Sequence, residues 1–245
     1  MEESRIFRWR IKMNINQSYQ EKNGIIFGAS SFVGKTIGNY LTQQGVNLGL
    51  IDLESHEGDM IEKNLEKQNK IIYRTVKSGD QNGMEKVMEE MRNTLGNIDF
   101  LICAYYIDEM RSKRKPEDLS LETWDNIFQD WIVNYFLILK AFVPSMIHAK
   151  KGRIIFFNTT SGYTGEGEGE GEITLTGTIH ESACSSGITG MMTSIAHDII
   201  PHGISVNGIA LGPDYKADPE RIIWTANLWF SGLGEYSCGQ IVRLY

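Results

Sequence analysis

A glycine-rich turn is the first feature of this sequence that could do chemistry. Gly28-Ala-Ser30-Ser-Phe-Val-Gly34 follows the apolar run Gly24-Ile-Ile-Phe27 and opens a segment with helical periodicity. Backbone N–H groups at a helix N-terminus attract anions, and the helix dipole adds to this attraction. The turn therefore predicts a pyrophosphate site with Gly28, Ser30 and Gly34 as contacts. The alternative is a tight turn that packs the helix against the strand without any ligand.

A carboxylate stands near the end of the next apolar run. Asp52 lies 24 residues after Gly28, in Gly49-Leu-Ile-Asp52-Leu. In dinucleotide-binding α/β units an acidic residue about 20 positions after the glycines accepts the ribose hydroxyls of NAD and disfavours the phosphate of NADP. Asp52 is therefore the residue that would select NAD.

A second group of polar residues could serve acid–base chemistry. Glu181 and Ser185 are four apart and share one helix face, whereas the neighbouring His180 cannot share the face of Glu181. The other members of the group are Thr159, His197 and Asp198. Two interpretations are open, a new acid–base pair or polar residues at a surface or pocket rim. No histidines and acidic residues have the spacing of a metal site, so we expect no metal.

These residues lie on a chain in which apolar runs alternate with segments of helical periodicity. The strand-like runs are 24–27, 47–53, 70–76, 100–104, 153–158, 205–210 and 240–244. The helical segments are 36–44, 60–67, 81–94, 121–148, 180–200 and 219–230. Runs without a polar face predict a parallel sheet covered on both sides. We therefore expect a doubly wound α/β fold of Rossmann type with seven parallel strands.

Length, composition and charge exclude several classes of protein. The 245 residues carry 24 basic and 31 acidic side chains, a net charge of −7, and 41% are hydrophobic. This balance is typical of one globular α/β domain. We expect no nucleic-acid binding, because the only dense basic run, 111–115, has the character of a solvated loop. We also expect no membrane span and a cytoplasmic location, because we find neither an apolar run near 18 residues nor a signal peptide.

Three further segments complete this description. Cys103, Cys184 and Cys238 lack Cys-x-x-Cys spacing and indicate neither a disulfide framework nor a zinc site. Residues 166–172 alternate glycine with glutamate and predict a mobile, anionic loop. The polar residues 1–22 predict a loosely attached extension, which leaves 23–245 as the domain.

Taken together, the glycine turn, Asp52 and the seven strands resemble the short-chain dehydrogenase/reductase family. Three further stretches are similar to family elements, and the resemblance covers about residues 23–245. These stretches are Glu117-Asp-Leu-Ser-Leu-Glu-Thr-Trp124-Asp125, Ile200-Pro-His-Gly203-Ile-Ser-Val-Asn207 with its Gly212-Pro213 turn, and Cys238-Gly239-Gln240-Ile-Val. The family oxidises alcohols or reduces carbonyls with a serine, a Tyr-x-x-x-Lys pair and an asparagine.

The resemblance assigns each catalytic position to a residue of this sequence. Counting without gaps places the tyrosine position on Glu181 and the lysine position on Ser185. The serine position falls on Thr159 and the asparagine position on Trp131. Ser185 carries no charge to lower a neighbouring pKa, and an ionised Glu181 has no proton to donate. The Tyr-x-x-x-Lys pair is therefore missing, and only the hydroxyl at Thr159 is kept.

The positions for the cofactor also depart from the family pattern. Tyr105-Tyr106 stands where small residues let the adenosine ribose approach, and Phe32 occupies the second glycine position. A milder alternative aligns Ser31 with that glycine, as in the extended branch of the family. We expect no bound cofactor, and NAD if there is one.

Three functions follow as hypotheses. The first is a non-catalytic subunit that supports an active NAD-dependent paralogue in a hetero-oligomer, through helices 121–148 and 180–200 and the C-terminal strand. The family offers a precedent in an alcohol dehydrogenase of anaerobic toluene breakdown that acts on an aromatic succinyl-CoA. The second is an active oxidoreductase that uses Thr159 and Glu181 in altered roles. The third is a regulator that senses a dinucleotide.

Overall fold

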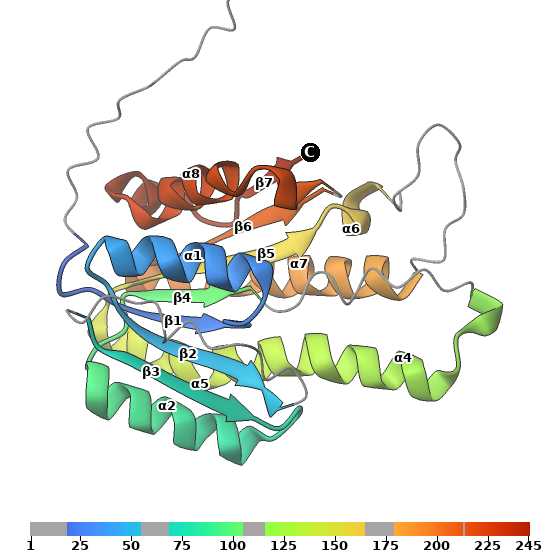
Figure 1. Cartoon of the computed structure of the whole chain (residues 1–245), viewed down its shortest axis with the longest axis horizontal. Coiled ribbons are helices and arrows are strands. Elements are labelled where there is room, and N and C mark those ends of the chain that lie inside the picture. The colour runs from blue at the N-terminus through green and yellow to red at the C-terminus, as the bar shows by residue number, and fades with distance from the viewer. Residues whose placement is uncertain (1–18, 55–68, 105–115, 165–178, 213) are drawn as a thin grey trace, which may run out of the picture.

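The chain folds around one central sheet, shown by a computed structural model that describes residues 19–54, 69–104, 116–164, 179–212 and 214–245 (Figure 1). The sheet has seven parallel strands in the order β3-β2-β1-β4-β5-β6-β7. The strands are β1 (Asn23–Phe27), β2 (Asn47–Leu53), β3 (Ile71–Val76), β4 (Phe100–Cys103), β5 (Gly152–Thr159), β6 (Ile204–Leu211) and β7 (Ile241–Leu244). The order reverses direction between β1 and β4, as in a doubly wound fold. The fold predicted from the sequence is confirmed.

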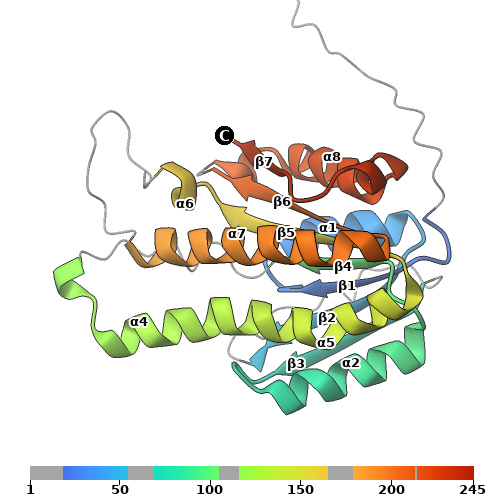
Figure 2. The same cartoon turned by 180° about the vertical axis from the view of Figure 1, so that it is seen from behind.

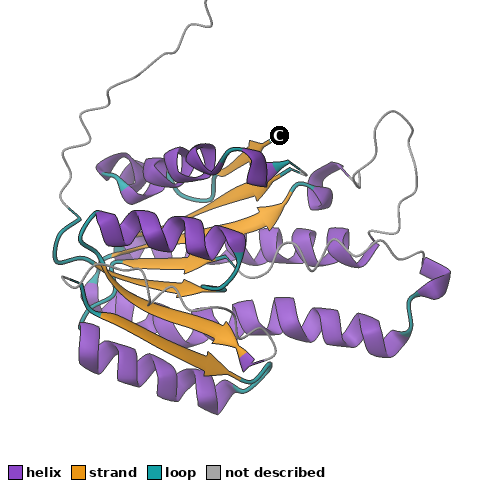
Figure 3. Cartoon of the chain, in the orientation of Figure 1, coloured by secondary structure: helices purple, strands orange, loops and turns teal. Residues whose placement is uncertain are grey.

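Helices cover both faces of the sheet, and the orange strands of Figure 3 lie between purple helices. The α-helices are α1 (Phe32–Gln43), α2 (Gln81–Leu95), α4 (Leu121–Phe128), α5 (Asn134–Ala149), α6 (Ser161–Thr164), α7 (Ile179–Ile199) and α8 (Pro219–Phe230). A π-helical turn, Gln129–Val133, joins α4 to α5. Short 3₁₀ turns lie at Pro116–Asp118, Ile200–His202, Tyr215–Ala217 and Gly232–Tyr236.

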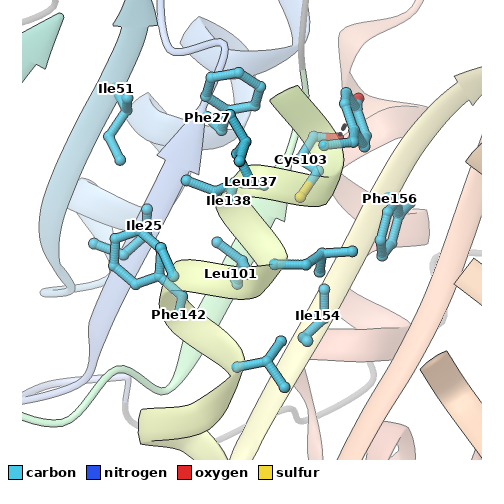
Figure 4. Packing of buried hydrophobic residues seen from close by; sticks show 14 of the residues in the cluster. Ile25, Phe27, Ile51, Leu101, Cys103, Leu137, Ile138, Phe142, Ile154 and Phe156 are labelled. Atoms are coloured by element: carbon cyan, nitrogen blue, oxygen red, sulfur yellow. Dashed lines mark hydrogen bonds between the residues drawn. The ribbon is translucent and has the colours of Figure 1, made fainter. Parts of the chain in front are cut away.

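Two hydrophobic clusters form the core, one on each face of the sheet. Side chains of α1 and α8 pack on one face, and those of α2, α5 and α7 pack on the other (Figures 1 and 2). Alternate residues of a strand point to opposite faces, so Ile25 and Phe27 join one cluster and Ile26 joins the other. Figure 4 shows Ile138 and Phe142 of α5 among the strand residues of their cluster. Strands that are buried on both faces explain the nearly continuous apolar runs of the sequence.

Side-chain caps fix where several helices begin. Ser31 accepts a hydrogen bond from the N–H of Gly34 (2.9 Å), and Asp80 accepts one from the N–H of Gly83 (2.9 Å). Because Ser31 is the cap, α1 begins at Phe32 rather than at the predicted residue 36.

The long apolar segment 121–148 forms three consecutive helical pieces rather than one helix. The pieces run from Leu121 to Ala149, and the whole is long and apolar enough to cross a membrane by composition alone. Half of its most apolar window is buried inside the fold. Residues of the second and third pieces join the core on one face of the sheet, as in the core helices of soluble domains.

Some predictions lie outside the described residues. They are the helix at 60–67, the basic run 111–115, the Gly-Glu segment 166–172, Tyr105-Tyr106 and most of the extension 1–22. At the end of that extension, Tyr19 is buried against Phe100, with ring centroids 6.0 Å apart. Lys22 forms an ion pair with Asp99 at 3.3 Å. The last residues assigned to the extension are therefore packed on the domain.

Candidate functional site

The predicted site residues gather at the carboxyl ends of the parallel strands. The glycine turn follows β1, Asp52 is the penultimate residue of β2, and Thr159 ends β5. Ligands of open α/β sheets bind in the crevice at this edge, near the point where the strand order reverses. The fold therefore brings the candidate cofactor and catalytic positions to one edge of the sheet.

The glycine turn is a hydrogen-bonded structure built around Ser31. Gly28 adopts a φ of 85°, a conformation that favours glycine. The Ser31 hydroxyl donates at 2.7 Å to the carbonyl of Gly28 and lies 2.8 Å from the carbonyl of Ala104. The same oxygen caps α1, so one buried serine joins the turn, the helix and the end of β4. The turn is thus ordered by contacts within the chain.

Gly34 allows α1 to approach the turn closely. A Cβ atom at this position would lie 2.1 Å from the carbonyl oxygen of Gly28 and 2.8 Å from the Cα of Ala29. Both neighbours are backbone atoms that cannot rotate away. Close packing without a ligand, one of the two interpretations of the turn, explains this glycine fully.

Asp52 lies beneath the turn and has no exposed surface. The N–H of Ser30 donates a bifurcated hydrogen bond to both carboxylate oxygens, at 3.1 Å each. A hydrogen bond from an amide to a carboxylate is among the stronger ones in proteins. The carboxylate thus supports the turn, and a ribose could reach it only if its surroundings moved.

Phe32 extends the turn with an aromatic contact. Its ring meets the ring of Tyr215 edge-on with centroids 5.6 Å apart, and Tyr215 follows β6. The ammonium group of Lys216 lies 5.8 Å from the centre of the Phe32 ring. Two aromatic rings therefore bridge the start of α1 and the segment after β6.

The resemblance places the catalytic lysine at Ser185, where the structure has a hydrogen-bonded joint. Ser185 is fully buried, and its hydroxyl donates to the carbonyl of Thr159 at 2.9 Å. The side-chain amide of Asn158 donates to the carbonyl of Ser185 at 2.7 Å. Ser182 and Ser186 add hydroxyl bonds to the carbonyls of Ser161 (3.2 Å) and Gly162 (3.0 Å). Together these bonds fasten α7 to the end of β5 and to α6.

The predicted polar group is only partly assembled. Glu181 is 5% exposed and His180 is fully buried, both in the first turn of α7. Thr159 is buried and shares a hydrogen bond with Ser161. His197 and Asp198 are exposed in the last turn of α7. They lie about 24 Å from Glu181 along the helix, at 1.5 Å per residue, and therefore do not belong to the site.

Trp131 lies in the π-helical turn, and its side chain is buried in the core with 5% of the residue exposed. The buried amide of Asn134 holds this turn by donating to the carbonyls of Gln129 (3.1 Å) and Asp130 (3.0 Å). Its oxygen accepts from the N–H of Gly79 at 3.0 Å. π-helical turns occur often at functional sites. The position that the resemblance assigns to the asparagine thus holds a buried indole, and Asn134 has a structural role.

Two tyrosines near the site were missed by sequence reasoning. The hydroxyl of Tyr135 is 3.2 Å from the carbonyls of Cys103 and Phe157, at the ends of neighbouring strands. Tyr163 shares a 2.7 Å hydrogen bond with Thr189 and lies under the guanidinium group of Arg243. Burial raises the pKa of Tyr163 above its ordinary value, so this phenol stays protonated at neutral pH. Neither residue is in a recognisable motif, and only their three-dimensional surroundings reveal them.

The comparisons with known proteins agree with this geometry. A family model described as short chain dehydrogenase matches residues 22–215. The 3-oxoacyl-[acyl-carrier-protein] reductase FabG of Escherichia coli is 25% identical over 197 residues, which cover 80% of this chain and 74% of that protein. The corresponding FabG of Haemophilus influenzae is 25% identical over 195 residues, covering 79% and 74%. The chain therefore belongs to the short-chain dehydrogenase/reductase family.

Solved structures show the same fold. Cj0485 dehydrogenase superposes with a TM-score of 0.78 at 18% identity and covers 94% of both chains. Levodione reductase superposes with a TM-score of 0.77 at 16% identity, covering 92% of this chain and 96% of its own.

Members of this family typically bind NAD or NADP, so we compare the described residues with what a dinucleotide needs. The glycine turn lies between β1 and the N-terminus of α1, where a pyrophosphate would bind. At the ribose end, Asp52 is fully buried and bonded to the turn. At the nicotinamide end, Ser185 supplies no cation and is itself buried. The residues described therefore do not fit a dinucleotide held for hydride transfer.

Metal chemistry has no visible site in the part of the chain that the structure describes. No group of three or more His, Cys, Asp or Glu side chains is arranged to hold an ion among these residues. The three cysteines are free thiols. Burial raises the pKa of Cys184 to about 12, which makes it a poor nucleophile at neutral pH.

Proposed function

We propose that this chain is a catalytically inactive short-chain dehydrogenase/reductase subunit that supports an active, NAD-dependent paralogue in a hetero-oligomer. The joint at Ser185 carries this proposal. Where the family pattern has a lysine, this chain has a buried hydroxyl bonded to the backbone of β5. Catalysis by the family needs a cation there to lower the pKa of a proton donor, and a serine cannot supply it.

Glu181, one helical turn before Ser185, also supports the proposal. Its side chain is a carboxylic acid at the position that the resemblance gives to the tyrosine, the family's proton donor. Trp131 adds an indole at the asparagine position, and an indole donates one hydrogen bond but accepts none. The framework that carries these positions is intact, and a fold can outlast its chemistry.

The interaction surface follows from exposed apolar side chains on the helices named for assembly. Phe136 on α5 is 51% exposed, and Ile179 at the start of α7 is 47% exposed. Leu121, at the start of α4, is 74% exposed. Covering large apolar side chains with a partner removes apolar surface from water, which stabilises the complex. We assign these helices and β7 to the contact with the paralogue, in the cytoplasm.

A reconstitution experiment tests this function. The chain is expressed with and without an intact family member from the same genome, and NADH and NADPH consumption is followed with a 3-oxoacyl thioester. The chain alone should show no turnover above the rate without protein, and it should co-purify with the active paralogue. Phe136→Asp should abolish co-purification because it places a charge in an apolar contact, whereas Lys86→Asp on α2 should not. Turnover by the isolated chain would contradict the proposal.

A second candidate is an active reductase with altered catalytic residues. The matched FabG proteins of Escherichia coli and Haemophilus influenzae are reductases by name, and Thr159 keeps a hydroxyl that is bonded to Ser161. In this alternative Thr159 and Glu181 would act in altered roles, with Glu181 in place of the family's tyrosine. Turnover that is lost in both Thr159→Val and Glu181→Gln would support this candidate over the first.

A further inference from the structure

A separate cavity lies at the opposite edge of the sheet, where the strands begin. It has a volume of about 490 Å³, within the range of small-molecule sites. Its polar and charged lining residues are Tyr19, Lys22, Asp99, Lys150, Lys151, Arg153 and Ser205. Its apolar lining includes Phe100, Ile200, Ile204 and Phe230. None of the candidate catalytic or dinucleotide positions lines it.

The sheet register places three of the lining residues side by side. Phe100 of β4 is paired with Arg153 of β5, and Arg153 is paired with Ser205 of β6. Paired residues of neighbouring strands point to the same face of a sheet. An aromatic ring, a guanidinium group and a hydroxyl thus form one row along the cavity wall.

The charge of the cavity is strongly positive in a chain that is acidic overall. Four cations line it, Lys22, Lys150, Lys151 and Arg153, against the single carboxylate of Asp99. Asp99 is 5% exposed, lies 3.3 Å from Lys22 and is also paired with Lys151. One carboxylate therefore offsets only part of the positive charge.

Arg153 and Lys150 face the cavity from different elements. Arg153 also donates to the carbonyl of Phe230 at the end of α8, which holds its guanidinium group at the wall. Lys150 takes a left-handed conformation, with φ of 51°, directly after α5. Its side chain is exposed, so it can reach a bound anion without first breaking a buried ion pair.

Ser205 provides an independent sign of a missing ligand. Its side-chain oxygen is inaccessible to solvent and has no hydrogen-bond partner among the described residues. A buried hydroxyl without a partner costs stability, and most such groups in folded proteins have one. Ser205 lines the cavity as a direct neighbour of Arg153, and its side chain would have to turn toward the cavity for its hydroxyl to meet a ligand oxygen.

We infer that this cavity binds a phosphorylated small molecule. The phosphate group would lie near Arg153, Lys150 and the hydroxyl of Ser205. An apolar or aromatic portion of the molecule would pack beside Phe100 and Ile204. Arginine and lysine together are well suited to phosphate, because one offers paired N–H donors and the other a compact charge. The inference does not depend on whether the candidate site at the carboxyl ends of the strands is active.

Calorimetric titration with phenyl phosphate tests the inference, with inorganic phosphate and phenol as comparison probes at constant ionic strength. Phenyl phosphate should bind saturably with a dissociation constant of about 1 mM or lower, and more tightly than either comparison probe. Ser205→Ala should weaken binding by about threefold to tenfold, the usual worth of one hydrogen bond. Lys150→Gln should weaken it by about tenfold, whereas Lys86→Gln on the exposed face of α2 should leave it unchanged.

Thermal unfolding of each variant without ligand provides the folding control. A lack of saturable binding would overturn the inference. Binding that is equally tight in the Ser205 and Lys150 variants would also overturn it, because the anion would then occupy another site, such as the glycine turn.

Discussion

At the residue scale, the buried hydroxyl of Ser185 makes the first half of α7 part of a structural contact with β5. Its hydroxyl joins α7 to the last carbonyl of β5, and the carbonyl of Ser185 itself accepts from Asn158 and Thr189. All of these groups lie at the seam between β5 and α7. Buried hydrogen bonds at such a seam stabilise the fold.

The closed seam predicts a specific loss of stability. Ser185→Ala removes the donor to the carbonyl of Thr159 and should lower the free energy of unfolding by about 1–2 kcal/mol, because a buried acceptor loses its partner. Ser194→Ala, at an exposed position of the same helix, should change it by less than about 0.5 kcal/mol. Urea unfolding of the two variants measures the difference. Equal stability of both would show that the hydroxyl contributes nothing to the joint.

At the scale of elements, the glycine turn is explained by packing. Gly34 lies against the backbone of Gly28 and Ala29, and Asp52 supports the turn through the N–H of Ser30. The motif that predicts a ligand from the sequence therefore has a complete structural explanation within the chain. Helix and strand need this close approach whether or not a ligand binds.

Two glycine substitutions separate packing from helix propensity. Gly34→Ala should destabilise the fold by about 1–3 kcal/mol, because its Cβ would meet backbone atoms that cannot give way. Gly190→Ala in α7 meets nothing within 4 Å and should stabilise the isolated chain by about 0.5–1 kcal/mol through helix propensity. Thermal and urea unfolding of both variants provide the comparison. If Gly34→Ala were as stable as the parent chain, the account of the turn would be wrong.

The elements themselves could be predicted well from the sequence, and the contacts between them could not. The apolar run 47–53 and the helical period of 219–230 match β2 and α8 because burial on the sheet dictates both patterns. The π-helical turn at Trp131 was not predicted, since one added residue hardly changes a hydrophobic period. The burial of Asp52 beneath Ser30 was also missed, because spacing along the chain does not show which way a carboxylate faces.

At the scale of the whole molecule, one tyrosine hydroxyl and two thiols are buried in their protonated form. Burial raises the pKa of Tyr19 to about 12 and that of Cys184 to about 12, and it raises the pKa of Cys103 further. All three groups are neutral when protonated, so the folded state holds its protons at a pH where the unfolded chain releases them.

Stability should therefore fall on the alkaline side. The contribution of the thiols is fully present below their unfolded pKa of about 8.5, and that of Tyr19 below about 10. Both are lost as pH rises toward the folded-state pKa values, because only the unfolded chain ionises in that interval. Each buried thiol should cost roughly 2–3 kcal/mol by pH 10.5. Urea unfolding between pH 7.5 and 10.5 measures the slope, which should be smaller in Cys184→Ala. A flat profile in the parent chain would contradict the burial of these groups.

The proposed function implies that the carboxyl edge of this sheet does not hold a dinucleotide for chemistry. Calorimetric titration of the purified chain with NAD and with NADP tests it most directly, with an intact reductase such as FabG of Escherichia coli as the positive control. We predict no saturable binding of either dinucleotide up to about 1 mM, where the binding free energy would be only about −4 kcal/mol. Saturable binding of either one in the micromolar range would contradict the account.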